Sequence, residues 1–130
     1  MPVVNEQIMP ATIASPAAAY AHAMLTSQPQ RWLHTSGVVP IAPDGTVPDS
    51  VHDQAEVVWS NIGAMLTEAD MEPVHIVSVT TYVLPGRDLR SVMAARDRFL
   101  GGHLAASTLL VVPELAQPAW QLEIAVIAAQ

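Results

Sequence analysis

The sequence contains neither cysteine nor lysine among its 130 residues. The lack of cysteine excludes a disulfide framework, a thiolate nucleophile and a thiolate metal site. The lack of lysine excludes Schiff-base chemistry through a lysine side chain, so the five basic residues are all arginines. A cytoplasmic location is the default expectation for such a composition.

Charge is also scarce, at 13% of residues against roughly 25% in an ordinary soluble domain. The net charge is −7, and a nucleic acid partner would need a basic surface. The short arginine-containing run at residues 87–98 is typical of a solvated helix face. We therefore expect no nucleic acid partner.

Long hydrophobic runs are absent too, and none approaches the ~18 residues needed to span a bilayer. Residues 1–6 carry an acid and no base, which is not the pattern of a secretory signal. We expect no membrane association. The length fits one domain, residues 1–130.

The remaining composition is apolar, with 51% hydrophobic residues. A small domain has much surface per unit volume. So few charges cannot cover that surface, and the simplest cover is another copy of the chain. We therefore expect a homo-oligomer.

Periodicity and turn residues predict five strands and two helices. Residues 1–19 are expected to be irregular, and the first two strands to form a hairpin. Ser50 and Asp88 are the expected helix caps. The predicted elements are strands at 20–25 and 31–36, a helix from 49 or 50 to about 70, a strand at 75–84, a helix at 88–100, and strands at 105–112 and 121–129. The order β-β-α-β-α-β-β predicts an α+β fold with one sheet and both helices on one face.

The last predicted strand, residues 121–129, does not alternate apolar and polar residues. A strand with one solvated face would alternate. Apolar residues on both sides indicate that both faces are covered. Since the helices can cover only one face, we expect neighbouring subunits to cover the other.

Glu123 is the only charged residue between Ala116 and Gln130. An apolar strand would desolvate its carboxylate and favour the neutral form, which suits a general acid or base. The alternative is a structural role, with Glu123 facing solvent at a sheet edge or pairing with an arginine.

Other signals for chemistry are weaker. Ser36 beside Gly37 could offer a hydroxyl and an exposed N–H, or could simply form a turn. The five histidines have no metal-ligand spacing, and a glycine-rich phosphate loop is absent, so no metal and no cofactor is expected. His34 and His103, near strand ends, could line a pocket.

Several segments, taken in order, resemble those of one family. The matching segments are Thr35-Ser36-Gly37 with Pro40, Asn61-Ile62 with Ala64-Met65-Leu66, residues 77–83, Leu122-Glu123-Ile124 with Ile127-Ala128, and Ala19-Tyr20. The ordered set covers roughly residues 14–129 and resembles the Rid family (RidA/YjgF, also labelled endoribonuclease L-PSP).

The resemblance implies a chorismate-mutase-like fold and a homotrimer with small-molecule clefts between subunits. Deaminating members hydrolyse enamines and imines, such as 2-aminoacrylate, without a metal or cofactor. By the resemblance, Glu123 positions or activates water as the catalytic residue. Tyr20, Ser36 and Gly37 complete the substrate-binding cleft.

The sequence departs from the family pattern at the substrate carboxylate. Ala106, followed by Ser107, stands where the family has a carboxylate-binding arginine, and Met93 replaces a frequent asparagine. A bidentate arginine–carboxylate pair fixes orientation, and its loss would cost roughly 2–5 kcal/mol of binding. We therefore expect weak or no activity on 2-aminoacrylate. The expected substrate-binding site also includes Met93, Ala106 and Ser107, and we expect it to prefer a neutral or larger ligand.

Three functions remain open at this point. The first is a deaminase or related hydrolase of enamine or imine C–N bonds with an altered substrate. The second is a non-catalytic ligand-binding or chaperone-like homologue. The third, a ribonuclease, is disfavoured by the acidic composition.

Overall fold

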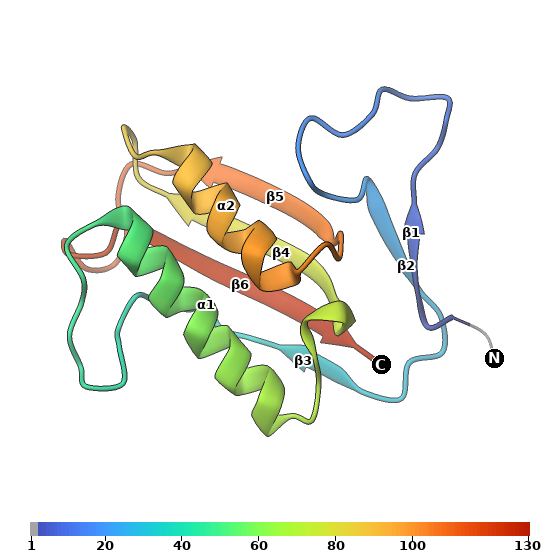
Figure 1. Ribbon diagram of the computed structural model, residues 1–130, viewed down its shortest axis with the longest axis horizontal. Coiled ribbons are helices and arrows are strands. Elements are labelled where there is room, and N and C mark those ends of the chain that lie inside the picture. Colours follow the sequence, from blue (N-terminus) through green and yellow to red (C-terminus); the bar gives the residue numbers. More distant parts are fainter. Residues whose placement is uncertain (1–2) are drawn as a thin grey trace.

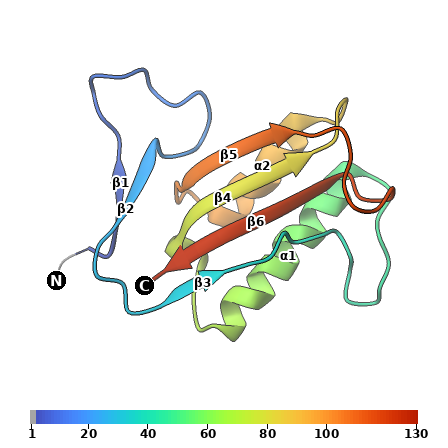
Figure 2. The ribbon, with the colours of Figure 1, turned by 180° about the vertical axis from the view of Figure 1, so that it is seen from behind.

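The computed structural model describes residues 3–130 and has two layers, a four-stranded sheet and a pair of helices (Figure 1). Both helices, α1 and α2, lie on the same face of that sheet, and Figure 2 shows the opposite face in front of them. The elements in chain order are β1 (Asn5–Ile8), β2 (Ala23–Thr26), β3 (Trp32–His34), α1 (Val51–Glu68), a 3-10 turn η1 (Pro73–His75), β4 (Ile76–Val83), α2 (Leu89–Leu100), β5 (Ala106–Val111) and β6 (Leu122–Ala129). The predicted α+β fold class is confirmed.

The main sheet has the strand order β3-β6-β4-β5. β6 runs antiparallel to both neighbours, β3 and β4, while β5 runs parallel to β4. A parallel pair needs a long crossover, and α2 supplies it between β4 and β5. β6 is thus an inner strand of the sheet, with a neighbouring strand on each side.

Local sequence signals define the ends of both helices. The Ser50 side chain accepts a hydrogen bond from the backbone N–H of Asp53 at 3.0 Å, which satisfies a free donor in the first turn of α1. Asp88 does the same for α2, accepting from the backbone N–H of Arg90 at 3.1 Å. Gly101 ends α2 with φ 58°, a left-handed conformation that favours glycine. The predicted caps are confirmed.

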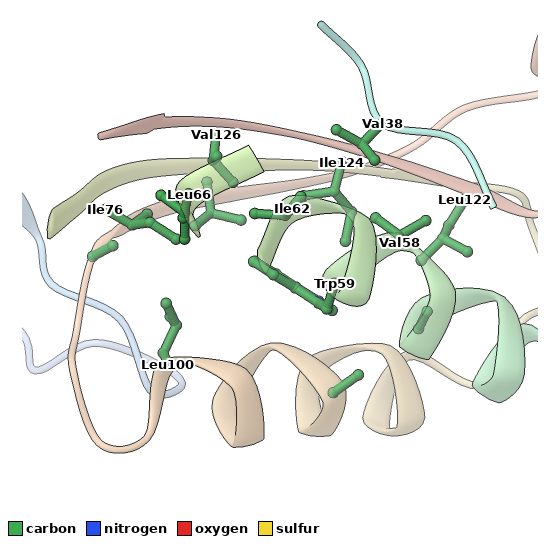
Figure 3. Packing of buried hydrophobic residues seen from close by; sticks show 14 of the residues in the cluster. Val38, Val58, Trp59, Ile62, Leu66, Ile76, Leu100, Leu122, Ile124 and Val126 are labelled. Carbon is green, nitrogen blue, oxygen red and sulfur yellow. The ribbon is translucent and has the colours of Figure 1, made fainter. Parts of the chain in front are cut away.

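The hydrophobic core lies between the helices and the sheet (Figure 3). Val58, Ile62 and Leu66 of α1 are at most 1% exposed and face the sheet, where Ile124 and Val126 of β6 meet them. Each such side chain contributes roughly 1.5–3 kcal/mol through its removal from water. This packing fixes which face of β6 the helices cover.

The predicted hairpin of residues 20–25 and 31–36 is wrong. β2 pairs with β1 in a separate two-stranded sheet, and β3 pairs with β6. The chain does not reverse after β2 because the backbone N–H groups of Gln30 and Arg31 both donate to the carbonyl of Gln130. These bonds carry the chain to the edge of β6 instead.

The prediction that residues 1–19 are irregular is wrong for the segment that forms β1, while residues 1 and 2 lie outside the described part. The Asn5 side chain donates to the carbonyl of Ala129 at 2.7 Å and accepts from the Thr26 hydroxyl at 2.9 Å. Asn5 therefore ties the small sheet to the end of β6. Residues 3–130 therefore form six strands in two sheets, not five in one.

The two faces of β6 differ within a single chain. Leu122, Ile124 and Val126 are buried under the helices, whereas the intervening side chains are only half-buried. One chain therefore covers one face of the strand, and cover for the other face by a neighbour stays a prediction. In the described part of the chain, neither helix is both long enough and apolar enough to span a membrane.

Candidate functional site

Glu123 lies on the side of β6 that points away from α1 and α2. We call this side of the main sheet the helix-free face. On β4 the cross-strand partner of Glu123 is Tyr82, and both side chains are half-buried. Directly opposed side chains in an antiparallel pair lie about 4.5–5.5 Å apart at Cβ, so Tyr82 borders the carboxyl group.

Gly37 lies directly against the carboxyl group of Glu123. A Cβ atom added at Gly37 would stand 1.9 Å from Oε2 of Glu123, which is far inside van der Waals contact. The chain is held there because the N–H of Val38 donates to the carbonyl of Ile124 at 2.7 Å. The carboxyl group of Glu123 can occupy this position because residue 37 has no side chain.

Ser36 and Gly37 also border an open groove of about 690 Å³ between the segment after β3 and the outer side of α1. Its size falls within the 300–1,000 Å³ range of small-molecule sites. Most of its lining is apolar, with Glu68 as the charged member. The lining residues are Leu33, Ser36, Gly37, Val38, Val39, Ile41, Asn61, Ala64, Met65, Glu68 and Ala69.

Tyr20 and Ala106 form a second group at the other end of the sheet. The residue after Tyr20, Ala21, bridges to Ala106, and its N–H donates to the carbonyl of Ala105 at 3.0 Å. The Tyr20 hydroxyl accepts from the N–H of Ala17 at 3.2 Å. Tyr20 is thereby held beside the start of β5.

The register of the sheet separates these two groups. Ala106 pairs with Ser78 of β4, whereas Glu123 pairs with Tyr82. Four residues of strand at about 3.3 Å each place the two levels roughly 13 Å apart. A single chain therefore brings Glu123 to Gly37 and Tyr20 to Ala106, but does not bring the four together.

Ser107 and Met93 lie on the helix side of the sheet. Ser107 pairs with the buried Val79, and its hydroxyl accepts from Nη1 of Arg96 on α2 at 3.3 Å. Met93 is half-buried on α2 itself. The sheet stands between these two residues and the carboxyl group of Glu123.

The two histidines expected near strand ends differ in role. His103 is engaged with the carbonyl of Ile76 at 2.7 Å. His34 is exposed on the helix-free face, with its ring centroid 6.0 Å from that of Trp32. Among residues 3–130, no three His, Asp or Glu side chains gather in a way that could hold a metal ion.

The family model described as Endoribonuclease L-PSP matches residues 11–130. The chain belongs to the Rid/YjgF family. A search of curated proteins gives no match. Among solved structures, a Rid-family protein of unknown function from Yersinia pestis, YyfB, is 25% identical, with a TM-score of 0.88 over 98% of this chain and 100% of that one.

Two further structures share the fold of this Rid/YjgF protein. Yeast Mmf1 is 26% identical over 97% of this chain and 98% of its own, with a TM-score of 0.70. Escherichia coli TdcF, solved with bound serine, is 22% identical over 96% of this chain and 98% of its own, with a TM-score of 0.71.

Tyr82 lies opposite Glu123 in this Rid/YjgF protein, and the sequence did not single it out as a candidate site residue. Its segment was matched only as part of a strand, because nothing local to residues 77–83 relates them to Glu123. The antiparallel register of β4 and β6 places it there. The sequence could have placed Tyr82 opposite Glu123 only if the pairing of β4 with β6 had been known.

Proposed function

We propose that this Rid/YjgF protein forms a homotrimer whose clefts between subunits bind a small molecule. We propose further that the cleft hydrolyses an enamine or imine C–N bond of a substrate other than 2-aminoacrylate. Glu123 would act on a water molecule, and no metal or cofactor would take part. Tyr20, Ser36, Gly37 and Ala106 would line the cleft.

One observation carries this proposal: the candidate residues divide into two groups whose levels along the strands are roughly 13 Å apart on one chain. Gly37 and Glu123 form one group, and Tyr20 and Ala106 form the other. A site that uses both groups needs the first from one subunit and the second from its neighbour. The apolar, half-exposed residues of the helix-free face between them support such an association.

The chemistry needs only water and one carboxylate. The carboxylate of Glu123 takes a proton from water as the water oxygen adds to the carbon of the protonated imine, and a neutral carbinolamine forms. The same carboxyl group then returns that proton to nitrogen and the C–N bond breaks. The hydroxyl proton passes to the departing ammonia, which leaves as ammonium while the carbonyl forms. A single group can serve as base and then as acid because it ends in its starting protonation state.

TdcF, which shares this fold, was solved with bound serine. That observation supports binding of a small amine-bearing molecule somewhere on this fold.

Generating 2-iminopropionate in situ with semicarbazide as the competing trap tests the catalytic proposal. We expect slow hydrolysis by the native protein, none by Glu123→Gln, and faster hydrolysis by Ala106→Arg. The control is Glu114→Gln, which changes an exposed acid in the loop before β6. If Ala106→Arg stays at the buffer rate while folded and assembled, the catalytic role of Glu123 is wrong.

A second function, a non-catalytic binding protein, is favoured by the apolar residues at positions 93 and 106. It predicts buffer-level rates for the native protein and for Glu123→Gln, together with saturable ligand binding by both. Calorimetric titration of the two proteins separates it from the catalytic proposal.

A further inference from the structure

The charges of the chain are distributed unevenly between the two faces of the main sheet. Glu123, which faces the helix-free side, is the only Asp, Glu, Lys or Arg within β3, β4, β5 and β6. Apart from His34 on β3, the other polar side chains there are neutral hydroxyls on β4 and β5. They are Ser78, Thr80 and Tyr82 on β4, and Thr108 on β5, which pairs with Thr80.

The arginines lie elsewhere, and four of the five have partners there. Arg31 donates to the carbonyl of Ala69 at the end of α1, and Arg87 donates to Gln121 in the loop before β6. Arg96 contacts Asp97 and Ser107 on the helix side.

The other two arginines are on α2. Arg98 pairs with Glu56 of α1, an interaction that joins the two helices. Arg90 is exposed in the first turn of α2, where its N–H donates to the Asp88 cap. None of the five guanidinium groups belongs to a strand of the helix-free face.

His34 is the remaining group on this face that can become positive. It pairs with Ile127 of β6, Ile127 pairs with Ser78 of β4, and Ser78 pairs with Ala106 of β5. Three strand spacings of about 4.8 Å put His34 roughly 14 Å from Ala106. It cannot replace a cation at position 106 within the same subunit.

From this distribution we infer that the substrate of the cleft is a neutral or protonated imine that carries no carboxylate. The inference rests on the proposed function and names its substrate class. A cleft between helix-free faces brings together Glu123 and neutral hydroxyls, so its fixed charge is negative. A protonated imine is attracted to that charge, whereas a substrate carboxylate is repelled and finds no guanidinium.

The balanced reaction for the cationic form is R₂C=NH₂⁺ + H₂O → R₂C=O + NH₄⁺. Water supplies the oxygen, and no oxidant or reductant is needed. Positive charge on the imine disappears from carbon as water adds, and Glu123 accepts the proton that water loses. The negative carboxylate stabilises the starting cation and is neutralised when the carbinolamine forms.

A matched pair of substrates with one skeleton tests the inference. Phenylalanine with an L-amino-acid oxidase gives an imine that keeps the carboxylate, and phenethylamine with a flavin amine oxidase gives the corresponding imine without it. The rate of semicarbazone formation measures free imine in both reactions. Two unit charges about 5 Å apart at an effective dielectric of 20 predict at least a tenfold faster protein-dependent hydrolysis of the imine without the carboxylate.

The Ala106→Arg variant supplies the internal control. Adding a guanidinium should reverse the order, with the carboxylate-bearing imine hydrolysed faster than its partner. Glu123→Gln should abolish the protein-dependent rate for both. These two variants separate the substrate preference from the catalytic step.

The outcomes distinguish the two levels of the account. Equal rates for the two imines, or a faster rate for the carboxylate-bearing imine with the native protein, would overturn the inference and leave the proposed function standing. No protein-dependent rate for either imine, with native protein and Ala106→Arg alike, would overturn the proposed function together with the inference.

Discussion

The two faces of β6 differ in how far the chain itself buries their side chains. On the helix side, Leu122, Ile124 and Val126 are at most 2% exposed and pack under α1 and α2. On the helix-free side, Ala125 and Ile127 are apolar yet only half-buried, beside the half-buried Glu123. The first face, which we call the finished face, is fully buried within one chain. The second face is as apolar as a core, but its side chains stay partly exposed in one chain.

The largest expected effect comes from a charge on the finished face. Ile124→Asp would place a carboxylate at a position that is 1% exposed, with no partner within the apolar core. We expect a loss of more than about 4 kcal/mol in the free energy of unfolding, enough to leave little folded protein. Circular dichroism with urea titration measures it, and a cooperative unfolding transition close to that of the native protein would contradict the packing described above.

The same charge one residue further along should act on assembly instead. We expect Ala125→Asp to keep the far-ultraviolet spectrum of the folded chain but to dissociate the oligomer, since like charges would meet across the helix-free faces. Light scattering measures the mass. Val74→Asp is the matched control, because Val74 is 54% exposed on the η1 turn beside α2. If Ala125→Asp remains fully assembled, the helix-free face is not the interface.

An intermediate effect is expected where a methyl group meets Glu123. Gly37→Ala should displace the carboxyl group, because the flexible end of Glu123 is what a new Cβ at 1.9 Å would strike. We expect Glu123-dependent hydrolysis or ligand affinity to fall nearly as far as in Glu123→Gln, with a stability change below about 3 kcal/mol.

Gly63→Ala is the control for Gly37→Ala. It adds the same methyl group 3.2 Å from the Phe99 ring on the helix side, far from the carboxyl group. Unchanged function in Gly37→Ala would show that the Gly37–Glu123 contact has no part in the site.

The smallest effect is expected at the start of α1, which covers only the finished face. Ser50→Ala removes the hydroxyl that accepts from the N–H of Asp53, and should lower the free energy of unfolding by about 0.5–2 kcal/mol without changing the oligomer. Ser60→Ala makes the same change at an exposed position within α1 and should be nearly neutral. Equal losses in the two variants would refute the capping role of Ser50.

Features that depend on nearby residues were predictable from the sequence. The caps Ser50 and Asp88, the glycine that ends α2, and the apolar stripe of α1 each involve contacts within one or two turns. The family followed from motif order over most of the chain. These signals fix the two helices and hence which face of the sheet is finished.

Features that depend on distant pairing were not predictable. β1 was missed because Asn5-Glu6-Gln7-Ile8 has no strand pattern, and its polar side chains find their partners at distant residues, Thr26, Leu104 and Ala129. The separation of Tyr20 from Glu123 was also hidden, since it follows from the register of β4 with both neighbours. Strand register is a property of the whole sheet, so no local pattern records it.

The mass of the native protein in solution tests the central claim most directly. Light scattering at micromolar concentration should give three times the 13.9 kDa of one chain, about 42 kDa, if three copies cover the apolar helix-free faces as we propose. A stable species of 13.9 kDa would contradict the account. It would leave Glu123 on an open sheet surface, with Tyr20 and Ala106 too far away to share a site.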